Sequence, residues 1–416
     1  MFEIGPENVE RAAKALEQDL CDHCLGRVFA HVSTGLSNDQ RGEAARRAVN
    51  EMRINYEMEP LVYATCSVCE DIFNDLDRFA QAIADEISKI ECHNFLVGTR
   101  VDPVIQSREE ALWSRVGQET AEPIKVELNR EIGKRASALL QKEVEFKAPE
   151  VVALVDTRFA HVDLDIAPLF VYGRYRKLSR EIPQTKWPCR ECRGKGCKRC
   201  NGTGKMYQTS VQEIIGAPLL AAAEGKEHFL HGMGREDIDA RMLGTGRPFV
   251  LEVSEPKKRD VDLAVMREEI NSSGIDRVEV SELRFSTREE VRQIKTDAPD
   301  KAYVVAIAFK DKVNKDRVNE VVRSLDRTPI CQQTPVRVAH RRADLERAKS
   351  IISARVEELT DDGMRLWLRT QSGTYVKEFV HGDGGRTRPN LSDLLGIPCE
   401  VLSLDVVEII DKETEA

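Results

Sequence analysis

Apolar and polar positions follow two different periods along the chain and divide it into two parts. The first part favours helices at 7–20 and 73–90 and a polar, helix-rich segment up to about 143, with one strand at 93–101. From residue 151 onward, runs such as VVALVDTRF, HVDLDI and LFVYGRY alternate or run apolar, which is typical of strands. The change of pattern predicts a domain boundary near 145, marked by Lys147-Ala148-Pro149.

The second part, 146–416, alternates strands with helices. The predicted strands are 247–253, 276–285, 302–309, 364–371 and 400–410, and the predicted helices are 209–225, 258–273, 288–294 and 313–325. Several strands carry polar residues at alternate positions, as strands do in antiparallel sheets with one face in water. The pattern predicts an α+β domain with a mixed, largely antiparallel sheet.

Composition narrows the class of protein. The chain has 416 residues, of which 41% are hydrophobic and 32% charged, a balance that favours folded domains over disorder. No apolar run approaches the roughly 18 residues of a membrane span, and the first ten residues lack the basic segment of a signal peptide. We therefore expect a cytoplasmic protein without a membrane segment.

Charge is distributed unevenly. The net charge is −9, and residues 1–150 carry 28 Asp/Glu against 18 Lys/Arg, whereas the remainder is close to neutral. Within the second part, residues 174–206 hold eleven Lys/Arg and only two acidic residues. A local basic stretch of this kind is typical of contact with a nucleic-acid backbone.

Eight of the eleven cysteines form four C-x-x-C pairs. They are Cys21/Cys24, Cys66/Cys69, Cys189/Cys192 and Cys197/Cys200. In a cytosolic chain two such pairs supply the four thiolates of a tetrahedral site, so we predict two structural zinc ions, with no position left open for catalysis. His23 and His93 are possible substitute ligands, and free, buried or redox-active thiols are the alternatives.

Two further segments are unusual. GMGREDIDARMLGTGRPF, at 232–249, combines glycines with both charge signs just before an apolar strand, but it contains no nucleotide-binding fingerprint. SGTYVKEFVHGD, at 372–383, follows a strand and would place Tyr375 and Lys377 on one face if the strand continued. Taken alone, each is equally compatible with a salt-bridged loop or a solvated surface.

Together these segments resemble a known family. GREDIDARMLGTGRPF resembles the catalytic-aspartate motif of pseudouridine synthases, and GTYVKEFVHGD resembles their third motif. With RYRKLSREIPQT at 174–185, QQTPVRVAHRRAD at 332–344 and the N-terminal C-x-x-C pairs, the chain is similar over nearly its whole length to the Pus-ten family, archaeal synthases acting on T-loop uridines 54 and 55 of tRNA. The order and spacing of the motifs carry this resemblance.

The resemblance implies an isomerisation that needs no cofactor. The N1–C1′ bond of uridine breaks and the uracil rejoins through C5, with an aspartate attacking either C1′ or C6. The matching residue is Asp237, with Asp239 as its rival. Lys377 is the expected cation beside it, with Arg235 as the second candidate, and the departure from arginine at position 377 keeps the charge but gives up bidentate geometry.

The resemblance also assigns substrate contacts. Tyr303 is expected to stack on the extruded uracil and is a candidate base for the C5 proton, while Tyr375 packs within the third motif. Arg180, Gln184, Arg341 and Arg342 are the candidates for handling RNA. The N-terminal part resembles a THUMP-like α/β accessory domain that grips tRNA, and we expect a basic face there around Arg41, Arg46, Arg47 and Arg100. Position 54, 55 or both stays open, and we expect a monomer without a protein partner.

Two other classes compete with this interpretation. CKRCNGTG resembles a unit of J-domain chaperones, so a non-catalytic zinc-stabilised RNA-binding protein is the alternative, although the HPD motif of a J-domain is missing. A THUMP-bearing methyltransferase or thiouridylase is disfavoured, because neither a glycine-rich cofactor loop nor an SGGxDS motif is present.

Overall fold

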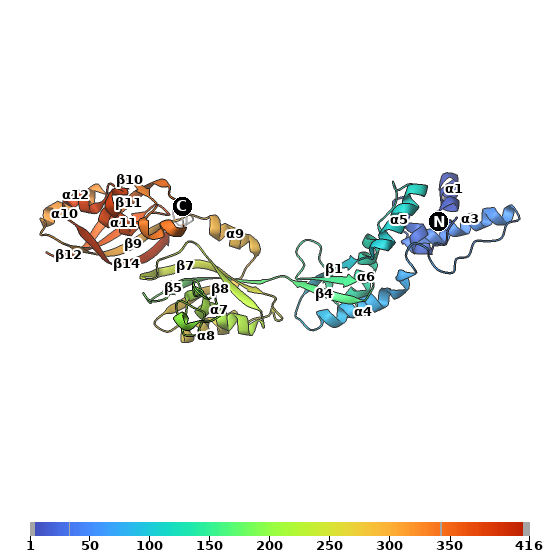
Figure 1. Cartoon of the computed structure of the whole chain (residues 1–416), viewed down its shortest axis with the longest axis horizontal. Coiled ribbons are helices and arrows are strands. Elements are labelled where there is room, and N and C mark those ends of the chain that lie inside the picture. The colour runs from blue at the N-terminus through green and yellow to red at the C-terminus, as the bar shows by residue number, and fades with distance from the viewer. Residues whose placement is uncertain (1–4, 33, 342, 411–416) are drawn as a thin grey trace. The chain divides into compact units, whose positions relative to one another are not determined.

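The computed structural model describes residues 5–32, 34–341 and 343–410, apart from the side chains of His340 and Arg341, and forms two compact units (Figure 1). Unit 1 comprises Met1–Ala167 with the short segment Lys257–Arg259, and unit 2 comprises Pro168–Pro256 and Asp260–Ala416. None of the helices in the described part of the chain is both long and apolar enough to cross a membrane.

Unit 1 is built on a four-stranded sheet in the order β2-β1-β3-β4. The strands are β1 (Asn94–Arg100), β2 (Glu143–Val144), β3 (Val151–Asp156) and β4 (His161–Ile166). Two helices, α4 (Leu76–Ile87) and α6 (Ile124–Leu140), pack against it (Figure 1). Helix α4 buries Phe79, Ile83 and Ile87, whose four-residue spacing places them on one face of a helix.

The remaining elements of unit 1 surround the N-terminal cysteines. They are α1 (Pro6–Ala15), α2 (Asp22–Arg27), α3 (Asn38–Asn55), η1 (Ile72–Asp75) and α5 (Pro103–Val116). The unit ends at residue 167 rather than near 145, because β3 and β4 complete its sheet instead of opening the next domain. The segment Lys257–Arg259 joins it through Arg259, whose guanidinium donates to the main-chain carbonyl groups of Glu150 and Ala167.

Unit 2 contains one ten-stranded sheet, in the order β13-β10-β11-β12-β9-β14-β7-β5-β8, with β6 paired to β7. The strands are β5 (Leu169–Lys177), β6 (Glu227–Gly232), β7 (Ala240–Ser254), β8 (Val278–Phe285), β9 (Asp300–Phe309), β10 (Thr328–Gln333), β11 (Glu346–Leu359), β12 (Gly363–Thr370), β13 (Thr387–Arg388) and β14 (Cys399–Ile410). Among the described pairings of this sheet only β14 with β7 is parallel, which confirms the predicted mixed, largely antiparallel sheet.

The helices of unit 2 are α7 (Val211–Ala222), α8 (Leu263–Ser273), α9 (Arg288–Thr296), α10 (Lys315–Ser324), α11 (Val376–His381) and α12 (Leu391–Leu395), with the short helices η2 (Lys198–Cys200), η3 (Val336–Arg341) and η4 (Gly382–Gly385). Four of them, α7 to α10, overlap the predicted ranges, and the other helices were not predicted. The condition stated for Tyr375 and Lys377 is not met: the chain does not continue as a strand after 371, and Tyr375 is the N-cap residue of α11. Lys377 therefore projects from a helix.

Candidate active site and metal sites

A cavity of about 160 Å³ lies beside Asp237 in unit 2. It is enclosed by the loop that precedes β7, by β9, by η3 and by the N-terminal end of α11. Five residues predicted from the sequence line it: Asp237, Tyr303, Tyr375, Lys377 and Arg235. The fold thus brings the two motifs and the β9 tyrosine to one place.

Buried side chains hold the Asp237 loop from beneath. Glu236 is buried and accepts from Arg247 Nε at 2.9 Å and from the Tyr175 hydroxyl at 2.9–3.0 Å. Lys177 is fully buried, and its Nζ donates to the carbonyl oxygens of Asp237 at 3.1 Å and of the next residue at 2.7 Å. Burial lowers the pKa of Lys177 to about 8. These contacts fix the backbone on either side of the Asp237 carboxylate.

The strand that follows the loop requires glycine. Gly244 in β7 has φ +58°, and a Cβ atom there would lie 2.0 Å from the carbonyl oxygen of Val407 in the adjacent chain segment. Only a residue without a side chain permits this approach of β7 to β14. The close packing of β7 against β14 therefore explains why the GREDIDARMLGTGRPF motif has glycine at position 244.

Two cations face the Asp237 carboxylate. Arg337 Nη1 lies 2.8 Å from Oδ2 and 3.0 Å from Oδ1, and Lys377 Nζ lies 3.5 Å from Oδ2. The other side of the Arg337 guanidinium binds Glu378, with Nε 2.6 Å from Oε1, and Glu378 is buried. Burial alone would lower the pKa of Arg337, but the charges of Glu378 and Asp237 raise it, so the arginine stays charged in the site.

Asp239 is placed differently. Both of its carboxylate oxygens bind Lys377 Nζ, at 2.8 and 2.7 Å, and its side chain is 67% exposed against 29% for Asp237. Partial burial would raise the pKa of Asp239, but the ammonium group of Lys377 holds it below its usual value. Lys377 is thus shared between the two aspartates and lies closer to Asp239.

The floor of the cavity carries a tyrosine and a lysine from β9. Tyr303 is buried, and this burial raises the pKa of its hydroxyl to about 12, so the phenol is neutral at neutral pH. Burial and the nearby Arg247 lower the pKa of Lys301 to about 8. Tyr303 pairs with Leu368 on β12 and Val406 on β14, which fixes its strand in the centre of the sheet.

The other predicted RNA contacts have internal partners. Arg180 donates to the Asp405 carboxylate at 2.6 Å and to two main-chain carbonyl groups. Gln184 is buried and donates to the Tyr175 hydroxyl at 2.8 Å and to the carbonyl of Gly234 at 3.0 Å. Both brace the Asp237 loop and its surroundings. Arg342 and the side chain of Arg341 lie outside the described residues.

Sequence reasoning missed Arg337, the cation closest to Asp237. The residue lies within the QQTPVRVAHRRAD stretch that carries part of the family resemblance, so its neighbourhood was identified. The contact was not predictable because it depends on η3, which brings Arg337 to the loop before β7. Nothing in the local sequence distinguishes Arg337 from the arginines at 341 and 342.

The N-terminal cysteines form the first cluster, defined by Cys21, Cys24, Cys66 and Cys69. All four are buried, their sulfur atoms lie within 4.8 Å of one another, and the Cys21 and Cys69 sulfurs are 3.6 Å apart. Zinc–sulfur bonds of about 2.3 Å imply sulfur–sulfur distances of about 3.8 Å in a tetrahedron. The cluster therefore fits a tetrahedral metal ion.

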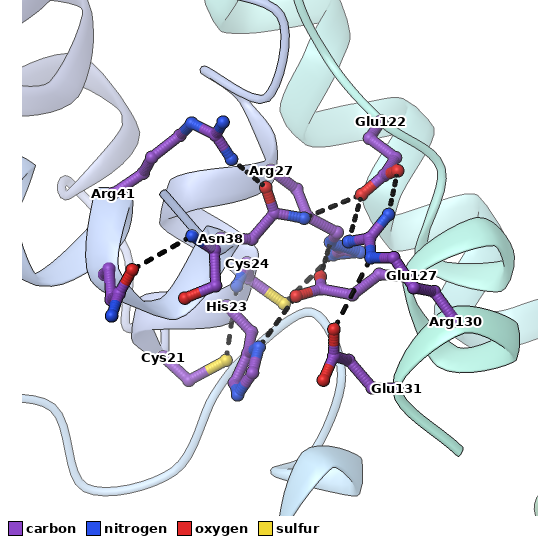
Figure 2. Close-up of polar contacts among 12 residues, drawn as sticks. Cys21, His23, Cys24, Arg27, Asn38, Arg41, Glu122, Glu127, Arg130 and Glu131 are labelled. Atoms are coloured by element: carbon purple, nitrogen blue, oxygen red, sulfur yellow. Dashed lines mark hydrogen bonds and ion pairs between the residues drawn. The ribbon is translucent and has the colours of Figure 1, made fainter. Parts of the chain in front are cut away.

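A buried charge network adjoins the first cluster (Figure 2). Arg27 Nη2 donates to the Cys24 sulfur at 3.1 Å, and its Nη1 donates to Glu109 at 3.0 Å. Its Nε lies 3.4 Å from Glu127, which also contacts His23 Nδ1 at 2.8 Å. His23 stacks on the Phe73 ring at 4.1 Å between centroids and is not among the metal-ligand groups of the described chain.

The expected basic face of unit 1 does not gather the four arginines. Arg41 is buried and donates to the Asn38 side chain at 3.0 Å, and Arg46 Nε donates to Asp22 at 2.8 Å. Arg47 forms an exposed pair with Glu43, and Arg100 lies 3.6 Å from Asp163. Three of these arginines face carboxylates and Arg41 is buried, so the four do not form an open cationic surface.

The second cluster, Cys189, Cys192, Cys197 and Cys200, lies in a turn-rich hairpin over 188–204. The measured sulfur–sulfur distances are 3.7–3.9 Å, which again match a tetrahedral tetrathiolate site. Main-chain N–H groups of Gly196, Cys197 and Gly204 donate to the sulfurs at 3.1–3.2 Å. Here the backbone, rather than charged side chains, supplies the hydrogen bonds to the thiolates.

Comparisons with known proteins agree with this arrangement. The family model described as Pus10, C-terminal, matches residues 170–410, and the archaeal Pus10 THUMP domain model matches residues 79–156. The chain belongs to the Pus10 family. It is therefore a pseudouridine synthase, an isomerase, and the alternative of a non-catalytic RNA-binding protein is set aside. The THUMP match continues past residue 145 to the end of β3, in agreement with the extent of unit 1.

Relatives match this Pus10-family chain over nearly its full length. The tRNA pseudouridine synthase Pus10 of Methanothermobacter marburgensis is 41% identical over 406 residues, covering 97% of this chain and 98% of its own. That of Methanothrix thermoacetophila is 40% identical over 414 residues, covering 94% and 91%. Among solved structures, a chain from the crystal structure of a Cbf5-Nop10-Gar1 complex is 13% identical, covers 57% of this chain and 48% of its own, and has a TM-score of only 0.32.

Proposed function

We propose that this Pus10-family enzyme converts uridine at T-loop position 54, 55 or both of tRNA to pseudouridine, with Asp237 as the nucleophile. The assignment of Asp237 as the nucleophile rests on the position of its carboxylate. This carboxylate faces a cavity and lies between Arg337 and Lys377. The tRNA substrate is supported by the relatives, which are named tRNA pseudouridine synthases, and by the THUMP domain match. The T-loop positions are supported by the resemblance of the motifs.

Geometry favours Asp237 over Asp239. Asp237 lines the cavity that also contains Tyr303, whereas Asp239 is not among the residues that line it. A nucleophile must reach the reacting carbon, and the carboxylate that faces this cavity is that of Asp237. Arg337 and Lys377 place two positive charges beside the Asp237 carboxylate, in a site from which a bound base excludes water.

The reaction balances without a cofactor. An Asp237 oxygen forms a bond either to C1′ or to C6 of the uracil, and on both routes the N1–C1′ bond breaks before the base turns. After the base has turned, a C5–C1′ bond forms, the carboxylate leaves, C5 loses its proton and N1 gains one. A target uridine in a folded RNA must first be extruded to reach a cavity of this kind.

We assign Tyr303 to stacking rather than to proton abstraction. Its hydroxyl has a pKa of about 12, so little phenolate is available near neutral pH. Tyr303→Phe should therefore keep most of the activity, whereas Tyr303→Ala should lose the ring that supports the base. Single-turnover rates of the two variants on the same tRNA measure this difference.

The deciding experiment is incubation of unmodified tRNA with purified protein and no added cofactor, followed by carbodiimide mapping of pseudouridine. We expect T-loop modification by the wild type and none by Asp237→Ala, with tRNA binding retained in that variant. Transcripts carrying cytidine at position 54 or 55 identify the site that is modified. Activity in Asp237→Ala combined with inactivity in Asp239→Ala would reverse the assignment.

Arg337 provides a second test of the same site. Arg337→Lys should lower the single-turnover rate by roughly 10²- to 10³-fold, because lysine cannot bind Glu378 and Asp237 at once as the guanidinium does. Arg317→Lys, at an exposed ion pair with Glu320 in α10, is the matched control and should leave the rate unchanged. An unchanged rate in Arg337→Lys, with normal tRNA affinity, would remove Arg337 from the proposed machinery.

We infer that the metal in both cysteine clusters is zinc, because tetrathiolate ligands at these separations suit it. Metal analysis of the purified protein should find two zinc ions per chain, and one in a variant lacking either cluster. Cytoplasmic location and the monomeric state stay predictions.

A further inference from the structure

A second cavity, of about 320 Å³, lies next to the Asp237 cavity in unit 2 and is not used by the proposed reaction. The two share five lining residues, Arg235, Glu236, Asp237, Arg337 and Lys377. The second cavity adds two aromatic rings, Trp187 and Tyr207. It therefore extends the site from the reacting group toward the second cysteine hairpin.

The two rings stand on opposite legs of that hairpin. Residues 188 and 205 form an antiparallel bridge, and the Met206 N–H donates to the Trp187 carbonyl at 2.9 Å. The ring centroids of Trp187 and Tyr207 are 5.6 Å apart at an interplanar angle of 79°. Since the four cysteines lie between these legs, a metal bound there would hold the rings in this edge-to-face arrangement.

One cation lies over the Trp187 ring, and two more basic residues are close to Trp187 in the sequence. The Arg235 guanidinium lies 5.2 Å from the Trp187 ring centroid, and Arg235 is itself exposed. Lys186 and Arg190, on either side of the Trp187–Pro188 pair, are also exposed. Both rings are only partly buried. Aromatic faces open to solvent and flanked by basic side chains are the usual platform for bases of a single-stranded nucleic acid.

We propose that Trp187, with Tyr207 and Arg235, forms a stacking subsite for an RNA base adjacent to the extruded uridine. The subsite rests on the proposed function, because a nucleotide bound there would be the strand neighbour of a uridine at Asp237. In this proposal the second cysteine hairpin takes part in RNA binding, because it holds Trp187 where an RNA base can stack at the edge of the active site. Packing within the hairpin is the competing explanation of the same rings.

Two substitutions of Trp187 separate stacking from packing. Trp187→Phe keeps a planar face, whereas Trp187→Leu keeps apolar volume without one. In the Asp237→Ala background, equilibrium binding of unmodified tRNA should weaken roughly 10- to 100-fold in Trp187→Leu and less than about threefold in Trp187→Phe. Phe285→Ala, at an exposed aromatic residue on β8, is the control and should bind as its parent does.

A direct probe of stacking is 2-aminopurine placed at each nucleotide flanking the target uridine. Its fluorescence should be quenched on binding when residue 187 is Trp or Phe and should stay high when it is Leu. Metal content is measured in parallel. If Trp187→Leu loses metal, the same binding and fluorescence measurements are made on Tyr207→Leu and compared with the quenching seen with Trp187→Phe.

The outcomes separate this inference from the proposed function. Normal pseudouridine formation by the wild type, with equal tRNA affinity and equal fluorescence in the Leu and Phe variants, would overturn the subsite and leave the proposed function intact. Ring-dependent quenching without pseudouridine formation would leave an RNA-binding subsite and overturn the proposed function. Equal weakening in Leu and Phe, without quenching in either, would favour packing and overturn the subsite.

Discussion

The two cysteine clusters have the same ligands but are built into the molecule in different ways. The first cluster belongs to the hydrophobic core of unit 1, and a buried guanidinium, that of Arg27, contacts one of its thiolates. The second cluster lies outside the main core of unit 2, in a glycine-rich hairpin whose thiolates accept from main-chain N–H groups. Identical C-x-x-C chemistry thus supports a domain core in one place and a surface hairpin in the other.

The difference separates stability from function. A metal in the first cluster joins α2 to the segment near η1, and Arg27 extends this connection to Glu109 in α5 and Glu127 in α6. A metal in the second cluster closes a hairpin that borders the Asp237 site. We therefore expect loss of the first to unfold unit 1 and loss of the second to change RNA binding.

The largest effect should follow Cys24→Ser. Structural zinc contributes about 10 kcal/mol or more to folding in small zinc domains, so unit 1 should lose its cooperative thermal transition while unit 2 keeps its own. Cys197→Ser, the matched change in the hairpin, should release one metal ion and leave both transitions within a few degrees. Calorimetry with metal analysis measures both, and equal destabilisation by the two variants would contradict the comparison.

Arg27→Met should have the next largest effect. The change leaves the buried Glu109 and Glu127 without their cation, which typically costs about 3–5 kcal/mol. Arg47→Met, at an exposed pair with Glu43, should change stability by less than about 1 kcal/mol. Chemical denaturation of both variants provides the values. Similar stability in the two would show that the network around the first cluster contributes little.

The pH dependence of unit 2 stability tests the partly buried lysine beside the Asp237 cavity, Lys301. Lys301 has a pKa of about 8 in the fold and about 10.4 when unfolded, so between these values the unfolded chain binds more protons. The stability of unit 2 should therefore rise as pH increases from about 8 to about 10, by roughly 1–3 kcal/mol. Lys301→Met should reduce this rise, as followed by urea denaturation. A parallel pH dependence in wild type and variant would exclude Lys301 as its source.

The smallest effect should come from single glycines of the hairpin. Gly204 has φ +70°, and a Cβ there would lie 2.3 Å from the carbonyl oxygen of Gly194, whereas Gly202 has φ +78° and open space. Gly204→Ala should release metal several-fold faster than Gly202→Ala, because only the first adds a steric clash to the backbone strain of about 1 kcal/mol. Metal transfer to a chromogenic chelator follows the rates. Equal rates would mean that the Gly194–Gly204 contact does not support the cluster.

Several elements were predictable because their sequence periods are strong. Helix α4 and strands β9 and β14 lie within two or three residues of the predicted ranges. The strand β11 was missed because charged residues are spread along its sequence, ERAKSIISARVEEL, and Ile351 is the one buried position in it. Its short apolar alternation at Ile352, Ala354 and Val356 does not stand out from the surrounding polar residues. Helix α3 was missed for a related reason: its buried positions include the small residues Gly42 and Ala45 and the polar residues Asn38 and Arg41, with Val49 as the one large apolar residue among them.

The cysteine sets, the Asp237 motif and the family could be obtained from the sequence alone, because spacing and motif order are local properties of the chain. Lys377 was expected beside Asp237, but the second cation, Arg337, could not be predicted. Arg337 meets Asp237 only because β9 and β14 occupy the centre of the sheet and bring η3 opposite the loop before β7. Likewise, only the fold shows that one metal cluster is buried in a charge network and the other carries Trp187 to the edge of the site, since burial and distance between remote residues are properties of packing.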